Sequence, residues 1–139
     1  MVDFFHAIIM VEDNMKVISI KQPWATLIAK GYKTYEFRSW KTKYRGEIYI
    51  HASKVVEKDK LDRFKHLSLD YPTGKIIAKA TLTDCIEVDK QFEEELIKKD
   101  KCIYGASSNR NGYAFKLEKI EELEEYIEAK GQLGIWNYK

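Results

Sequence analysis

The sequence predicts an α+β fold, namely a small, mixed and mostly antiparallel β-barrel with short peripheral helices. Several short segments alternate apolar and polar residues with the period of a β-strand. The helical segments between them are brief, whereas the crossover helices of a doubly wound sheet are longer. The chain has 139 residues, of which 45% are hydrophobic. This is enough for one domain with a substantial core.

The first half of the chain contains three predicted strands and one helix. Residues 16–20 alternate and are rich in β-branched side chains, which favours a strand. A helix is expected over 23–30, because proline opens the segment and apolar residues recur at helical spacing. Gly31 follows it and is well placed to end the helix in a left-handed conformation. Residues 33–40 and 46–53 alternate again, so we expect a strand in each.

The rest of the chain contains three further predicted strands and two helices. Periodicity places strands over residues 74–88 and 113–123. It also predicts an exposed helix over 55–69 and an amphipathic helix over 90–99. A closing strand is expected near Trp136. The polar, glycine-containing segment 104–112 is predicted to be a loop.

Positive charge is concentrated in one part of the chain. Residues 16–55 contain nine Lys or Arg against Glu36 and Glu47, a net charge of +7, although the whole chain carries only +2. A cationic segment in a nearly neutral protein is typical of a protein with an anionic partner. The simpler alternative is a lysine-rich surface that serves solubility.

Composition also argues against several classes of protein. Cys85 and Cys102 lie far apart and form no CxxC pattern, so we expect no disulfide framework, no zinc site and a cytoplasmic location. No metal or other cofactor is expected, because the three histidines lack ligand spacing. No apolar run is long enough to cross a bilayer. Residues 1–14 lack the features of a signal peptide, and we expect them to be an N-terminal extension of a domain over 15–139.

Three motifs lie close together between residues 22 and 53. They are a Gln-Pro-Trp-Ala corner at 22–25, a GxKxxExR pattern at 31–38 and the segment YRGxIxIHAS at 44–53. In combination they resemble the ASCH domain family, within the wider PUA-like fold. The later segments GKIIAKATLTDC, YAFKLE and KGQLGIW are also similar to that family. The resemblance covers residues 16–138.

The resemblance implies a small PUA-like barrel with a cleft beside the first helix, in a superfamily proposed to act on RNA or nucleotides. One branch is similar to small amidohydrolases that remove the acetyl group from an acetylated cytidine. In that branch the lysine of the second motif is catalytic, together with a threonine three positions on and a glutamate from a later loop. Lys33 matches the lysine, Glu36 stands at the threonine position, and the candidates for the later glutamate are Glu87, Glu93, Glu94 and Glu95. Other relatives resemble ribonucleases, or only bind nucleic acid.

Lys33 and Glu36 are the predicted catalytic residues. Glu36, Arg38 and Trp40 point to one face of the predicted strand, which Lys33 begins. A carboxylate flanked by two cations keeps its charge and accepts hydrogen bonds. A lysine desolvated by the fold loses its proton readily and can serve as a base or nucleophile.

The other candidates would contact a nucleotide. Lys21 and Gln22 lie at the strand-to-helix corner, where exposed backbone N–H groups favour anions. Arg45 suits a forked contact with phosphate, and His51 and Ser53 share a strand face. The complete predicted binding set is Lys21, Gln22, Lys33, Glu36, Arg38, Trp40, Arg45, His51 and Ser53. Trp40, Tyr104, Tyr113 and Trp136 offer stacking faces for bases, although most of these rings must fill the barrel.

Three functions remain open from the sequence. The first is an ASCH-type module that binds RNA or a nucleotide in a cationic cleft. The second is a small hydrolase that uses Lys33 on an acetylated cytidine or on RNA. The third is an adaptor whose cleft is vestigial. The first two require that Lys33, Glu36 and Arg38 gather with Lys21 around one hollow.

Overall fold

A mixed sheet of six strands forms the body of the protein. The computed structural model describes residues 15–105 and 112–138, so the predicted extension 1–14 and most of the predicted loop 104–112 lie outside the described residues. The strand order is β2-β5-β4-β3-β1-β6. The strands are β1 (Met15–Gln22), β2 (Tyr35–Arg38), β3 (Gly46–Val56), β4 (Lys75–Glu87), β5 (Tyr113–Glu128) and β6 (Ile135–Tyr138).

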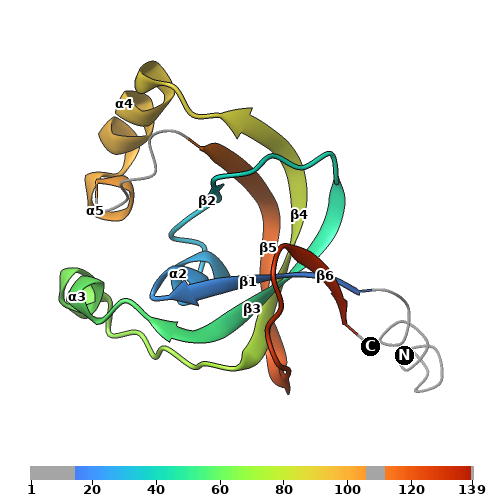
Figure 1. Cartoon of the computed structure of the whole chain (residues 1–139). Helices are drawn as coiled ribbons and strands as arrows, with labels where there is room; N and C mark the ends of the chain where they lie inside the picture. The colour runs from blue at the N-terminus through green and yellow to red at the C-terminus, as the bar shows by residue number, and fades with distance from the viewer. Residues whose placement is uncertain (1–14, 106–111, 139) are drawn as a thin grey trace.

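The predicted mixture of pairings is confirmed. β1 and β3 are parallel, with Ile18 opposite Ile50. The pairs β1–β6, β2–β5, β3–β4 and β4–β5 are antiparallel. β4 and β5 bend together through three shifts of register, because an extra residue in one strand increases the local twist. The result is the strongly curved sheet in Figure 1.

The sheet does not close into the predicted barrel. β2 and β6 lie at its two edges, and no ladder joins them within the described ranges. Each edge strand has only four residues and therefore offers few backbone groups for a closing ladder. The fold is an open, curved sheet with peripheral helices.

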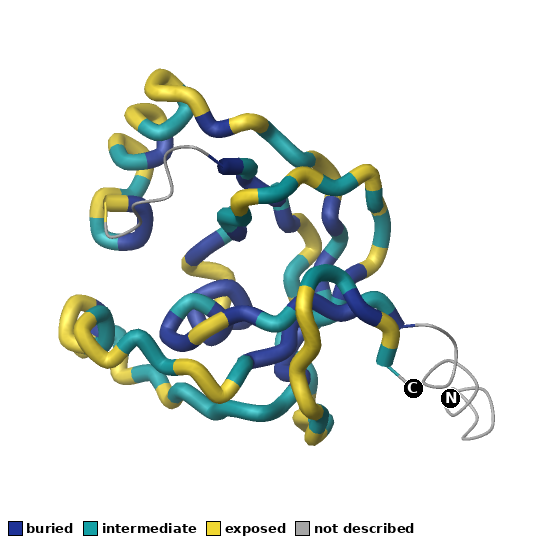
Figure 2. Tube along the Cα trace, in the orientation of Figure 1, coloured by how far each residue is buried: buried dark blue, intermediate teal, exposed yellow. Residues whose placement is uncertain are grey.

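Helix α2 (Trp24–Ala29) lies inside the curve of the sheet, where it contacts β1, β3, β4 and β5. All its residues except Trp24 are buried, and Figure 2 shows the contrast with the outer helices, where most residues are exposed or half-buried. Those elements are α3 (Lys58–Leu61), the 3₁₀ helix η1 (Asp62–Leu67), α4 (Lys90–Lys99) and α5 (Lys101–Tyr104).

The predicted helix over 55–69 is shorter than expected. β3 continues to Val56, which pairs with Gln22 of β1, and helical backbone occupies only α3 and η1. Phe64 of η1 is completely buried, in a second apolar cluster with Leu27 of α2 and Leu96 of α4. The pairing of β3 with β1 therefore overrides the helical pattern at the start of this segment.

Candidate functional site

The end of α2 places Lys33. Gly31 has φ of +83°, the left-handed conformation predicted for it, and the chain reverses there. The backbone N–H groups of Tyr32 and Lys33 both donate to the carbonyl of Leu27, at 2.9 and 3.1 Å. Lys33 is thereby fixed between the end of α2 and the start of β2.

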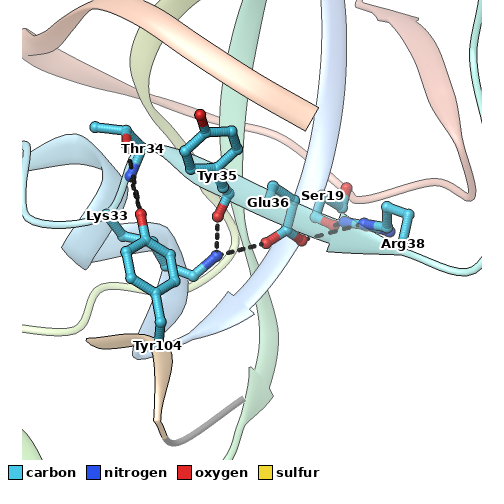
Figure 3. A network of polar contacts seen from close by, with 7 residues as sticks. All are labelled: Ser19, Lys33, Thr34, Tyr35, Glu36, Arg38 and Tyr104. Atoms are coloured by element: carbon cyan, nitrogen blue, oxygen red, sulfur yellow. Dashed lines mark hydrogen bonds and ion pairs between the residues drawn. The ribbon is translucent and has the colours of Figure 1, made fainter. Parts of the chain in front are cut away.

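The Lys33 side chain is only 2% exposed. Its Nζ donates to the carbonyl oxygen of Tyr35 and lies 3.3 Å from Oε1 of Glu36 (Figure 3). The same nitrogen lies 4.9 Å from the ring centre of Phe37 and 5.8 Å from that of Trp24. The ammonium group is therefore held by one carboxylate, one carbonyl and two aromatic faces.

Glu36 bridges two cations. Its Oε2 accepts a hydrogen bond from Nε of Arg38 at 3.1 Å, and Nη2 of Arg38 donates to the carbonyl of Ser19 on β1. Glu36 and Arg38 are two residues apart on β2 and so share one face, as predicted. Side-chain exposure increases from Lys33 (2%) through Glu36 (12%) to Arg38 (22%). The three residues form a charged row, named here the Lys33 network, that leads from the interior to the surface.

Burial changes the acidity of Lys33. Loss of solvent lowers the pKa of its ammonium group below the ordinary value of 10.5, and the nearby carboxylate of Glu36 opposes this effect. The amine is thus easier to deprotonate than a surface lysine, which is the property that a lysine nucleophile or base requires.

Tyr104 anchors the start of β2. Its hydroxyl accepts a hydrogen bond from the backbone N–H of Thr34 at 3.0 Å. Its ring is 5% exposed and makes edge contacts with Tyr35 and Phe37. Tyr104 is therefore part of the packing around the Lys33 network and does not offer the stacking face that the sequence suggested.

An open groove of about 1100 Å³ lies beside the Lys33 network. Its walls come from β1, β3, the start of β4, and the β5–β6 connection at residues 129–134. Arg38 belongs both to this groove and to the Lys33 network. Lys33 and Glu36 do not line the groove.

Cations outnumber carboxylates among the described residues that line the groove. Five of its lining residues are cations, and the one carboxylate among its described lining residues is Glu128; the cations are Lys21, Arg38, Lys54, Lys75 and Lys130. Within the described part of the chain, none of the four lysines has a carboxylate at ion-pair distance. Unpaired positive charges in one concave surface attract an anionic ligand.

His51 and Ser19 form the floor of the groove. His51 is 1% exposed, and its Nε2 lies 2.7 Å from the carbonyl oxygen of Ala129. Its Nδ1 has no hydrogen-bond partner among the residues that the structure describes. Trp136 packs edge-on against the imidazole and donates from Nε1 to Ser19 Oγ at 3.1 Å. A Cβ on Gly131 would lie 3.0 Å from His51 Cε1 and from Ser19 Oγ, so a glycine lets this loop pack closely on the floor.

The sequence expectation that Lys33, Glu36, Arg38 and Lys21 gather around one hollow is met only in part, because Arg38 and Lys21 line the groove and Lys33 and Glu36 do not. Lys33, Glu36 and Arg38 form one network, whereas Lys21 is exposed and meets Arg38 only as a lining residue of the groove. Ser53 also lines the groove, and its Oγ accepts from the backbone N–H of Val55 at 3.3 Å.

Three other predicted site residues lie elsewhere. Gln22 is fully buried, where its side chain bonds the backbone and hydroxyl of Thr26 and the carbonyl of Pro72. Trp40 packs edge-on against Phe115, with ring centres 5.1 Å apart. Arg45 bonds neighbouring carbonyls and lies 3.7 Å from Asp84 in an exposed pair. None of the three lines the groove.

The contacts described for Lys33 include none of the candidates for the later glutamate of the amidohydrolase pattern. The carboxylate that contacts Lys33 is that of Glu36. Glu87 ends β4, and the other candidates lie on α4.

No group of three or more His, Cys, Asp or Glu side chains within the described ranges could hold a metal ion. Nor does any described helix have the length and apolarity to span a bilayer.

Sequence reasoning missed a large part of the groove. Lys54, Lys75, Lys130, Gly131 and Leu133 were not predicted as site residues, although all of them line it. The segment KGQLG at 130–134 carried a signal, because two glycines around two residues are typical of a tight loop. The lysines of the groove gave no such signal in the sequence, since lysine is common on every protein surface.

Comparison with known sequences identifies the family of the chain. The sequence model of the ASCH domain matches residues 18–134. Activating signal cointegrator 1 of Mus musculus is 29% identical over 131 residues, which cover 86% of this chain and 21% of that protein. The protein of the same name from Homo sapiens is 36% identical over 90 residues, covering 56% of this chain and 15% of that protein. The chain thus spans about a fifth or less of these relatives.

Solved structures agree on the fold. The crystal structure of ASCH from Zymomonas mobilis matches with a TM-score of 0.55 and 20% identity, covering 82% of this chain and 73% of that chain. A mutant form of the Zymomonas mobilis protein matches with a TM-score of 0.51 and 19% identity, covering 82% and 75%. Together with the match of the family model to most of its length, this curved sheet with its enclosed helix identifies the chain as a member of the ASCH domain family.

Proposed function

We propose that this ASCH domain binds single-stranded RNA, or a nucleotide segment of it, in the groove between β1, β3 and the β5–β6 connection. The observation that carries the proposal is the set of lining lysines without carboxylate partners in the described part of the chain, next to Arg38. Such a surface suits an RNA strand, because the phosphates of the strand follow one another along its backbone. The nucleic-acid role that the resemblance to the ASCH family implies agrees with this charge.

Arg38 is the central contact in this proposal. Its guanidinium is held in one orientation by Glu36 and by the Ser19 carbonyl. An arginine fixed in this way loses little conformational freedom when it binds a phosphate. The lysines around it supply the remaining charge. Lys33 and Glu36 act through Arg38, as residues that position it.

Salt dependence tests the proposal. The affinity for a labelled single-stranded oligoribonucleotide is measured by fluorescence anisotropy over a series of KCl concentrations. Because each phosphate neutralised on a single strand contributes about −0.7 to the slope of log K against log salt, the double variant K54Q/K130Q should lose about 1.4 from the slope. The matched control is K98Q/K99Q on α4, which removes the same charge from exposed positions outside the groove.

Two outcomes contradict RNA binding in the groove. If the α4 variant weakens RNA binding as much as the groove variant, RNA binding depends on the net charge of the protein and not on the groove. If wild-type affinity is independent of salt, phosphate contacts do not drive binding.

A second candidate function is hydrolysis that uses Lys33, on an acetylated cytidine or on RNA. The observation that favours it is the lowered pKa of the buried amine. It ranks second because the Lys33 nitrogen does not line the groove and is enclosed by Phe37, Trp24 and Glu36. To test for hydrolysis, wild type and K33M are each incubated with N4-acetylcytidine and with single-stranded RNA, and the products are measured by chromatography. Products that form with wild type and disappear with K33M support the hydrolase, and the absence of product from wild type contradicts it.

A further inference from the structure

Two exposed aliphatic side chains line the cationic groove. Leu133 is 97% exposed and Val55 is 52% exposed. Across the described ranges, the other exposed large apolar side chains are Tyr32 (44%) and Tyr126 (38%), which lie outside the groove. The same surface therefore contains two kinds of group: large apolar side chains exposed to water, and lysines without carboxylate partners.

The part of the groove that the structure describes offers no aromatic ring. None of the described lining residues is Phe, Tyr or Trp, and Trp136, which packs against His51, is 6% exposed. The exposed apolar contacts in the groove are therefore aliphatic. A ligand that covers them must carry a flat or apolar group attached to an anion.

An unpaired nucleobase on its phosphate backbone has this combination. Every base has a flat π-face that can pack on a side chain whatever the sequence, while its phosphates are the anions that the lysines require. In a duplex the faces of the bases are stacked on each other and are hidden from a protein side chain. The combination of charges and aliphatic contacts therefore favours a single strand over a duplex.

We propose that the groove holds an unpaired base of single-stranded RNA against Leu133 and Val55, while phosphates of the same strand lie on Arg38 and the surrounding lysines. This inference rests on the RNA-binding function proposed above and adds the element that selects single strands. Aliphatic side chains contact the face of a base and leave its hydrogen-bonding edge unread. Binding should therefore show little preference for base identity.

The test separates base contacts from phosphate contacts. The probes are a labelled oligouridylate, the same length of strand built from abasic ribose phosphates, and a duplex RNA of the same length. The variants are L133A and V55A, and the matched control is Y32A, which removes an exposed apolar side chain from outside the groove. Because Leu133 and Val55 are exposed, their urea unfolding midpoints should match that of wild type.

We expect L133A to weaken oligouridylate binding about fivefold to tenfold, the scale set by burying part of an aliphatic side chain. The salt slope should stay unchanged, because no phosphate contact is lost. Wild type should bind the abasic strand and the duplex more weakly than oligouridylate, and L133A should bind the abasic strand as wild type does. Y32A should bind all three probes as wild type does.

The outcomes distinguish failure of this inference from failure of RNA binding itself. If wild type binds oligouridylate and the abasic strand with equal, salt-dependent affinity and L133A changes neither, RNA binding stands and the base contact is wrong. Equal affinity for duplex and single strand also overturns the base contact. If no probe binds in a salt-dependent way, the proposed function fails, and this inference fails with it.

Discussion

The Nζ atom of Lys33 lies 3.3 Å from Oε1 of Glu36, at a position where the lysine side chain is only 2% exposed. A charge that is removed from water in this way is costly unless it has a partner. The pair therefore links the stability of the start of β2 to the charge state of one amine. Because Glu36 also orients Arg38, the same pair connects the interior to the groove.

Replacing Glu36 by Gln should destabilise the protein by about 3 kcal/mol, because it leaves a buried ammonium without its counter-charge. Urea unfolding measures the loss. The control is E121Q, which removes the carboxylate of an exposed pair with Lys79 at 3.8 Å and should cost about 0–1 kcal/mol. Equal losses in the two variants would show that the Lys33–Glu36 pair contributes no more than a surface pair.

The stability of the wild type relative to K33M should rise with pH toward 10.5. Burial lowers the pKa of Lys33 from 10.5, so between the lowered pKa and 10.5 the unfolded chain binds more protons than the folded chain. Stability then increases as pH rises through this window, and below it the cost of the buried charge is fully present. Urea unfolding of both proteins at several pH values between neutral and 10.5 gives the difference, in which the titrations common to both chains cancel. A difference that is independent of pH would sink this prediction.

Replacing Tyr104 by Phe should destabilise the protein by about 1 kcal/mol. The change keeps the ring contacts but leaves the half-buried N–H of Thr34 without its acceptor. Thermal or urea unfolding measures the effect, and Y32F, on an exposed ring, is the control with the same chemical change. We expect the control to match wild type, and a Y104F protein as stable as Y32F would show that the hydroxyl does not anchor β2.

Replacing Gly131 by Ala should weaken RNA binding about threefold and cost about 1 kcal/mol of stability, the lower end of overpacking effects. The added Cβ would lie 3.0 Å from both His51 Cε1 and Ser19 Oγ, so either these side chains or the loop that carries Lys130 and Leu133 must shift slightly. The control is Q132A in the same loop, which shortens an exposed side chain. Anisotropy with the oligoribonucleotide and urea unfolding measure the two effects. Unchanged affinity for G131A, with Q132A also unchanged, would show that close packing of this loop on the groove floor is not needed.

Local patterns in the sequence predicted most of the secondary structure. β1, α2, β3 and β4 lie within one to three residues of the predicted ranges, because each has a clear period of two or of 3.6 residues. The shared face of Glu36 and Arg38 was also predictable, since it depends only on the alternation of a strand. The family resemblance came from the same short segments, and the match over residues 18–134 confirms it.

The remaining features depend on contacts between distant residues, and local pattern does not contain them. Gln22 looked like a ligand contact, but the approach of Pro72 encloses it in the interior. Whether the sheet closes depends on the pairing of β2 and β6, which are at opposite ends of the strand order. The groove brings Lys21, Lys54, Lys75 and Lys130 together from four separate segments. The sequence by itself determined the elements and the family, because these follow from neighbours along the chain. The tertiary structure alone decided which charges are buried and which share a groove, because burial and electrostatic attraction depend on distances in space.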